Sequence, residues 1–121
     1  MARIDKRRPG TGRIKRIGDG PQCMRDDDGK LHYDLIPTGP LAELANVYTQ
    51  GSKKYADHNW RKGTEWSRAY AALQRHANKF WSGEDRDPEL QQHHLASVAF
   101  WAFALMEWGK THKELDDRYE K

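Results

Sequence analysis

The stretch from His76 to His94, HANKFWSGEDRDPELQQHH, holds the residues whose types and spacing best suit chemistry. Glu84 and Asp87 are three residues apart, which places them one helical turn apart if a helix begins there. Steps of four and three residues then put Asp87, Gln91 and His94 on one stripe. Carboxylate oxygens favour Mg²⁺ or Mn²⁺, and an added imidazole shifts the preference towards Mn²⁺.

The helix before this stretch brings two more candidates to the same hairpin, because only a short turn containing Ser82-Gly83 separates it from the acidic residues. His76 and Lys79 lie in its last two turns. The predicted metal ligands are Glu84, Asp87, His76 and His94, and the predicted catalytic residues are Glu84, Asp87 and Lys79.

Each of these candidates also has a purely structural interpretation. Glu84 fits a solvated loop, and Asp87 fits the N-cap of a helix. His94 falls on the helical face of Val98, which is typical of a core histidine. His76 shares a face with apolar residues of its own helix, which also favours burial.

A second cluster, GSKKYADHNWRKG at 51–63, combines positive charge with aromatic rings. Its cations suit phosphates, its rings offer flat faces to a base, and its amide and carboxylate groups can read base or sugar edges. The predicted substrate-binding residues are Lys53, Lys54, Tyr55, Asn59 and Trp60, with Lys30 as a weaker addition. A surface loop without a ligand is the alternative interpretation.

Helical spacing predicts the elements that position these residues. The first helix starts at about Pro40, and Gly51 ends or interrupts it. The second runs from about Glu65 to Trp81, and the third from Asp87, as its N-cap, to about Trp108. A short polar helix at 112–119 follows. The predicted fold is all-α, a small bundle of three to four helices.

The third predicted helix is apolar on nearly every side, which indicates a central position or a subunit interface. A chain of 121 residues buries little surface alone, so we expect a homo-oligomer, either a dimer or a tetramer. We expect the chain to divide into a basic arm at 1–29, a helical domain at 30–110 and a short helix or tail at 111–121.

Composition narrows the class of protein further. The net charge is +3, yet residues 1–20 alone carry seven Lys or Arg against two Asp, which predicts a flexible basic arm that could contact nucleic acid. No apolar run approaches the ~18 residues of a membrane span, and no secretory signal opens the chain. One cysteine allows neither an intramolecular disulfide nor a cysteine-based zinc site. We therefore expect a soluble, cytoplasmic protein that makes no contact with a membrane.

The order of the segments is more specific than any one of them. K-x3-DLIP precedes the first helix, G-x-KKY-x3-NW-x-KG follows it, and H-x4-W-SGE-x2-D joins the second helix to the third. Over about 30–108 the chain resembles the N-terminal domain of the phage dATP/dGTP diphosphohydrolases, a MazG-like family. The resemblance implies metal-dependent hydrolysis of a purine deoxynucleoside triphosphate to monophosphate and pyrophosphate, by a helical oligomer in the cytoplasm of a phage-infected bacterium.

The resemblance also assigns roles within the acidic hairpin. Glu84 and Asp87 match the ExxD half of the family's metal motif, whereas the place of ExxE is held by His76-x-x-Lys79 or, further up the chain, by Glu65-x-x-Arg68. Three alternatives follow from this departure: His76 or His94 substitutes as a ligand, Glu43 reaches in from the first helix, or the protein binds a nucleotide without hydrolysing it. A nucleic-acid-binding role for the basic arm is a further alternative.

Overall fold

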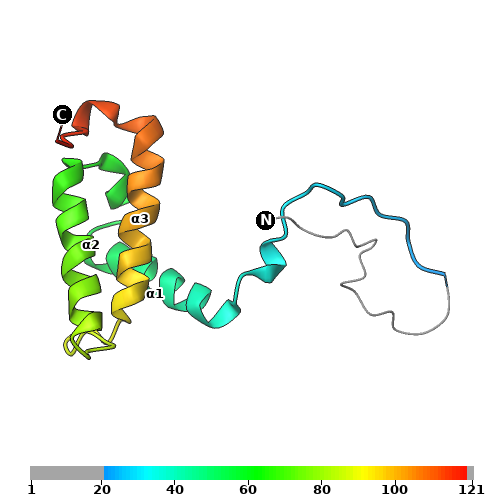
Figure 1. Cartoon of the computed structure of the whole chain (residues 1–121), viewed down its shortest axis with the longest axis horizontal. Coiled ribbons are helices and arrows are strands. Elements are labelled where there is room, and N and C mark those ends of the chain that lie inside the picture. The colour runs from blue at the N-terminus through cyan, green and yellow to red at the C-terminus, as the bar shows by residue number, and fades with distance from the viewer. Residues whose placement is uncertain (1–20, 120–121) are drawn as a thin grey trace. The chain divides into compact units, whose positions relative to one another are not determined.

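The computed structural model describes residues 21–119, and the helices in that range are joined by turns and loops. The elements in chain order are η1 (Tyr33–Leu35), α1 (Thr38–Lys54), η2 (Asn59–Lys62), α2 (Trp66–Trp81), α3 (His94–Thr111) and η3 (Lys113–Leu115), where η is a 3₁₀ helix (Figure 1). No β-strand occurs in this range, so the all-α prediction is confirmed. The chain divides after Leu35 into two units, and α1 to α3 belong to the second. The predicted basic arm falls largely on residues 1–20, which lie outside the described part of the chain.

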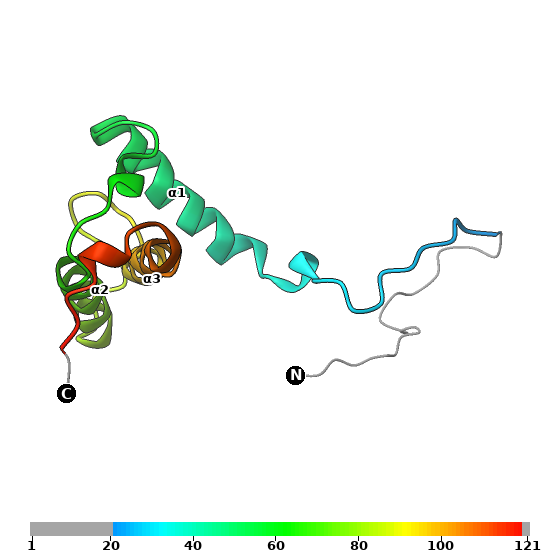
Figure 2. The same cartoon turned by 90° about the horizontal axis from the view of Figure 1, so that it is seen from above.

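The core of the second unit lies between α2 and α3, which run side by side in opposite directions (Figures 1 and 2). Ala69 of α2 and Ala104 of α3 are fully buried, and such small side chains let the two helices approach closely. Trp66 and Trp108 fill the space beside them. None of the helices in the described range is long and apolar enough to cross a membrane.

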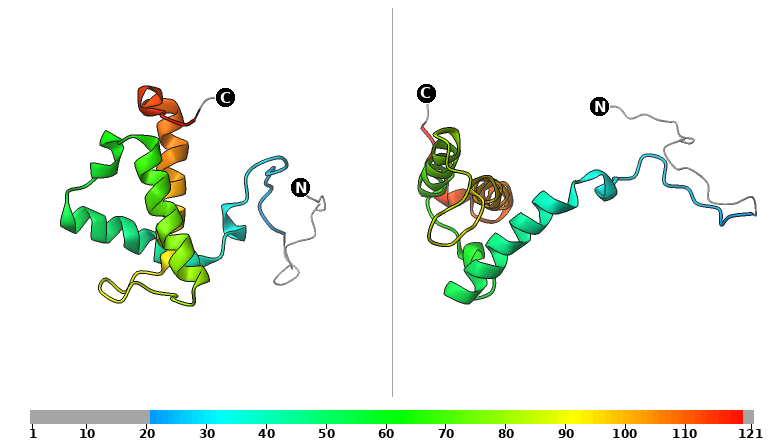
Figure 3. Two further views of the ribbon diagram at one scale, coloured as in Figure 1. Left: turned by 60° about the vertical axis from the view of Figure 1, so that its left-hand side comes forward. Right: turned by 90° about the horizontal axis from the view of Figure 1, so that it is seen from below.

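Helix α1 crosses this pair and packs on α3 (Figure 3). Leu44 and Val47 are the buried residues of α1, and the Tyr48 ring meets the Phe100 ring edge-on at 4.8 Å between centroids. Helix α3 packs against both other helices, which agrees with the central position that was one of the two predictions for its apolar sequence. Leu95, Phe103 and Met106 of α3 nevertheless remain exposed.

The loop after α1 is held against the C-terminal end of α3. The indole Nε1–H of Trp108 donates to the Trp60 carbonyl at 3.1 Å, and His112 Nε2 lies 2.7 Å from the Arg61 carbonyl. Gly63 passes beneath His112 with φ at +80°, a backbone conformation that favours glycine. A Cβ atom there would lie 2.8 Å from His112 Cδ2. The sequence therefore needs glycine at this position for the loop to dock.

Three predicted helix limits need correction. Helix α1 continues through Gly51 to Lys54, since one helical glycine costs only about 0.5–1 kcal/mol. Helix α3 begins at His94, not at Asp87, because Gln91 has φ at +63° and interrupts helical backbone before it. After α3 only one 3₁₀ turn forms, Lys113–Leu115, in place of the predicted helix over 112–119.

The segment that follows η3 instead caps the first turn of α2. The Asp117 carboxylate accepts hydrogen bonds from the Ser67 backbone N–H at 2.9 Å and from its hydroxyl at 2.5 Å. Glu65, which precedes α2, makes no capping hydrogen bond with its side chain, so Asp117 takes up one of the unpaired amides of the first turn. The predicted limits of α2, from about Glu65 to Trp81, are confirmed to within one residue.

Candidate functional site

The turn between α2 and α3 presents the acidic residues on a braced backbone. The Asp87 N–H donates to the Gln92 carbonyl at 2.8 Å, and the His94 N–H donates to the Asp85 carbonyl at 2.9 Å. The Glu84 N–H is bonded to the last turn of α2. Glu84 and Asp87 are thus fixed relative to the ends of both helices.

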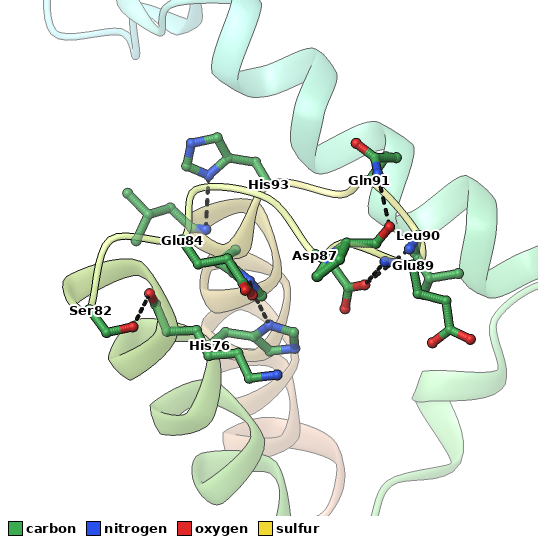
Figure 4. Close-up of polar contacts among 12 residues, drawn as sticks. His76, Ser82, Glu84, Asp87, Glu89, Leu90, Gln91 and His93 are labelled. Atoms are coloured by element: carbon green, nitrogen blue, oxygen red, sulfur yellow. Dashed lines mark hydrogen bonds and ion pairs between the residues drawn. The ribbon is translucent and has the colours of Figure 1, made fainter.

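His94 is the most deeply buried polar residue of this region, with no exposed surface. Its Nε2 lies 2.7 Å from Oε2 of Glu84, and its Nδ1 lies 2.9 Å from Nδ1 of His76 on α2. The Glu84 side chain is thus turned towards His94, and Figure 4 shows the polar contacts of this turn. A chain of hydrogen bonds therefore joins the half-buried Glu84 carboxylate to the imidazoles of His94 and His76. This chain orients the carboxylate.

Two Nδ1 atoms at hydrogen-bond distance must share one proton, so one of the two imidazoles donates and the other accepts. Burial lowers the pKa of His76, and the neighbouring His94 lowers it further. Both effects favour the neutral form of His76. His94 already uses both ring nitrogens, so it would have to give up one hydrogen bond to become a metal ligand.

Asp87 is held in a different way. Its Oδ1 accepts the backbone N–H groups of Leu90 at 3.0 Å and Glu89 at 2.8 Å, a contact that Figure 4 also shows. These bonds lower the pKa of Asp87, and the charges of His94 and Lys79 lower it further. The carboxylate caps its own turn, whereas the Nδ1 of His93 caps α3 by accepting the N–H of the second helical residue.

The donor atoms around this turn suit a hard divalent cation in type but do not close around one point. Within residues 21–119 no three His, Cys, Asp or Glu side chains gather closely enough to hold a metal ion. Oε1 of Glu84 and Oδ2 of Asp87 accept no hydrogen bond from any described residue. Two carboxylate oxygens are therefore open, which is the kind of ligand that Mg²⁺ and Mn²⁺ take.

A comparison with protein families places this site in context. The family model described as "dATP/dGTP diphosphohydrolase, N-terminal" matches residues 21–118. The chain belongs to this family. No curated protein and no solved structure gives a significant match to it.

The second cluster of this diphosphohydrolase-family chain is divided between α1 and η2. Lys53 and Lys54 form the basic last turn of α1, and Lys54 Nζ lies 5.2 Å from the centroid of the exposed Tyr55 ring. Asn59 and Trp60 belong to η2. The sixth predicted substrate-binding residue, Lys30, lies in the first unit, where its N–H closes a turn onto the Asp27 carbonyl.

Trp60 is packed more firmly than a free stacking surface would be. Its ring meets the Tyr48 ring edge-on at 6.1 Å, the Arg61 guanidinium lies 4.6 Å from its centroid, and its carbonyl accepts the Trp108 indole. It packs against the core between α2 and α3. Of the two predicted aromatic faces, Tyr55 is the exposed one, at 63% of its surface.

Sequence reasoning missed one residue of the acidic turn. Arg86 donates from Nη1 and Nη2 to the two carboxylate oxygens of Glu43 on α1, at 3.1 Å and 2.6 Å. Its Nη1 also donates to the Gln91 carbonyl at 2.9 Å. The hydrogen bond from Arg86 lowers the pKa of Glu43. No local pattern could have revealed a pair 43 residues apart.

Proposed function

We propose that this chain is a metal-dependent nucleotide pyrophosphohydrolase that converts a purine deoxynucleoside triphosphate, dATP or dGTP, to the monophosphate and pyrophosphate. Membership of a family named for dATP/dGTP diphosphohydrolase supports the reaction class. The observation that carries the proposal is Glu84, a half-exposed carboxylate anchored on a fully buried histidine with its second oxygen open. Such an outer partner is typical of carboxylates that must hold a metal ion in a fixed orientation.

In this proposal Glu84 and Asp87 hold Mg²⁺ or Mn²⁺. When bound, the metal would neutralise phosphate charge and lower the pKa of a coordinated water. His94 orients Glu84, and His76 orients His94 through their shared proton. Direct ligation by His76 or His94 stays a prediction.

The remaining residues of the proposed site bind the phosphates and the purine base of the substrate. Lys79, whose charge is already felt by Asp87, stabilises the negative charge that develops on the leaving pyrophosphate. Lys53 and Lys54 attract the triphosphate, and the exposed Tyr55 ring offers a face to the purine. Asn59 and Trp60 complete the proposed substrate-binding set, and a role for Lys30, which belongs to the first unit, stays a prediction from the sequence.

A second candidate function is nucleotide binding without hydrolysis. It is favoured by the absence of a three-ligand cluster in residues 21–119, since catalysis on a triphosphate needs a firmly held cation. A sequestering protein of the same fold would use the same lysines and aromatic ring but would leave the triphosphate intact.

We also propose a homo-oligomer, a dimer or a tetramer. Leu95, Phe103 and Met106 expose 41%, 48% and 66% of their surface on α3. Large apolar side chains that recur on one helix are typical of an interface between subunits. Size-exclusion chromatography with light scattering would give the mass of the assembly directly, and a monomer at micromolar concentration would refute this part of the proposal.

The activity is tested by incubating the protein with each deoxynucleoside triphosphate and Mg²⁺ or Mn²⁺, and separating the products by ion-exchange chromatography. We expect Glu84→Gln and Asp87→Asn each to abolish metal-dependent release of pyrophosphate. Glu89→Gln is the matched control, because it removes an exposed carboxylate of the same turn. Intact triphosphate in every reaction, together with retention of labelled nucleotide on a filter, would exclude the hydrolase and support the binding protein.

A further inference from the structure

Arg86 makes the one side-chain ion pair, within residues 21–119, that joins the acidic turn to α1. Both oxygens of the Glu43 carboxylate accept a hydrogen bond from the Arg86 guanidinium. The two bonds run in parallel, a geometry that only arginine provides. The same guanidinium bonds back to the Gln91 carbonyl of its own turn. One side chain therefore fixes the shape of the turn and ties the turn to a separate helix.

The backbone around Arg86 is equally constrained. Arg86 pairs with His93 in an isolated antiparallel bridge, and its two sequence neighbours each make a backbone hydrogen bond across the turn. Gln91, whose carbonyl Arg86 holds, has φ at +63°, a conformation that is unfavourable for a side chain of this type. A hydrogen bond at that point keeps the turn in a shape it would not otherwise prefer.

The core-facing contacts of helix α1 are apolar and aromatic. It packs on α3 through Leu44, Val47 and Tyr48, all on one side of the helix. Apolar contacts of this kind fix a helix less strictly in rotation and in sliding than a directed pair of hydrogen bonds does. The Glu43 carboxylate, next to Leu44 in the sequence, supplies that directed contact.

We propose that Arg86 is a positioning residue that sets the carboxylates of Glu84 and Asp87 in register with the basic end of α1, through its two-bond clamp on Glu43. The inference rests on the proposed function, because it assigns the carboxylates and the lysines of α1 to one substrate. Arg86 itself does not contact the phosphates: its Nη atoms are occupied by Glu43 and Gln91. Glu43, in turn, serves the clamp and is not a metal ligand.

The first test is kinetic and uses the full chain. Arg86→Ala should lower kcat for the preferred triphosphate by about 10–100-fold with KM changed far less, since a shift of about 1 Å in catalytic groups has an effect of this size. Arg86→Lys, which keeps the charge but cannot form two parallel bonds, should recover only part of the loss. Arg68→Ala, which removes an exposed arginine of α2, is the matched control and should leave kcat unchanged.

A double-mutant cycle separates a clamp from two independent roles. If Arg86 and Glu43 act as one unit, Arg86→Ala combined with Glu43→Ala should be no worse than either alone. A loss of kcat in the double variant equal to the product of the two single losses would overturn the proposal. So would a loss for Glu43→Gln far greater than that for Arg86→Ala, because that result would make Glu43 a metal ligand.

Hydrogen exchange gives a readout that does not depend on catalysis. The backbone amides of Asp87, Gln91 and His94 are bonded across the turn, and in Arg86→Ala they should exchange at least about tenfold faster while the core amides of α3 stay protected. Unchanged exchange in the turn would overturn the clamp whether or not the protein hydrolyses nucleotides. Wild-type protein that hydrolyses no triphosphate would refute the proposed function alone, and the exchange result would still decide the role of Arg86 in the turn.

Discussion

Gly63 is a position where an added methyl group should strongly lower the free energy of unfolding. Its φ is +80° and its ψ is +162°, a region that glycine alone occupies without strain. A Cβ atom would lie 2.8 Å from His112 Cδ2 and 2.9 Å from Leu115 Cδ1. We predict that Gly63→Ala lowers the free energy of unfolding by about 2–6 kcal/mol, of which about 1–3 kcal/mol is backbone strain and about 1–3 kcal/mol is overpacking.

Urea and thermal unfolding, followed by tryptophan fluorescence, measure this loss. For a domain of this size each kcal/mol shifts the Tm by about 4–8 °C, so the variant should melt about 10 °C or more below the wild type. Gly51→Ala is the matched control. Gly51 lies inside α1 with nothing near its added methyl group, and alanine there should stabilise the protein by about 0.5–1 kcal/mol.

The opposite signs of the two substitutions are the test of the reasoning. Gly63→Ala within about 0.5 kcal/mol of the wild type would mean that the loop relaxes freely and is not held under His112. Destabilisation by Gly51→Ala of the same size as by Gly63→Ala would mean that glycine is needed at both sites for another reason. The first result would refute the docking of η2 inferred from these contacts, and the second would refute the assignment of the loss to the backbone strain and close contacts of Gly63.

Three further predictions concern the buried polar contacts. His94→Phe should lower the free energy of unfolding by about 1–3 kcal/mol, since it leaves Glu84 without its buried partner, and urea titration measures the loss. Trp108→Phe removes an indole hydrogen bond to the η2 segment and should cost about 1–3 kcal/mol in the same assay. The Arg61 carbonyl and then an adjacent carboxylate raise the pKa of His112, so its stabilising contribution is fully present below the unfolded pKa of about 6.5 and is lost as the pH rises through the folded pKa. The difference in stability between wild type and His112→Asn should therefore be larger at acidic than at alkaline pH.

Helical periodicity sufficed for the elements whose faces are strongly apolar. The stripe of apolar residues from Trp66 to Phe80 fixed α2 to within one residue, because burial of one face decides where such a helix lies. The all-round apolar character of the third helix indicated a central position or a subunit interface, and α3 does pack against both other helices. The order of the motifs also led to the correct family.

Local signals failed where one residue suits two structures. Asp87 followed by Pro88 and Glu89 reads as the start of a helix, yet Asp87 caps an isolated turn with the same hydrogen bonds, and α3 starts seven residues later. Capping chemistry is identical in the two cases, so the sequence alone has no means to separate them. The predicted stripe through Asp87, Gln91 and His94 was wrong for that reason.

The acidic residues and histidines of the candidate site were identified from residue type and spacing, but their relations were not. Whether His94 faces a metal, the core or a carboxylate depends on how α2 and α3 pack in register, since only that packing brings Nδ1 of His76 to 2.9 Å from it. The Arg86 clamp on Glu43 likewise joins residues 43 apart in the chain. Residue chemistry was thus set by the sequence, while the pairing of these groups was decided by tertiary packing, because contacts between distant segments leave no short-range pattern to detect.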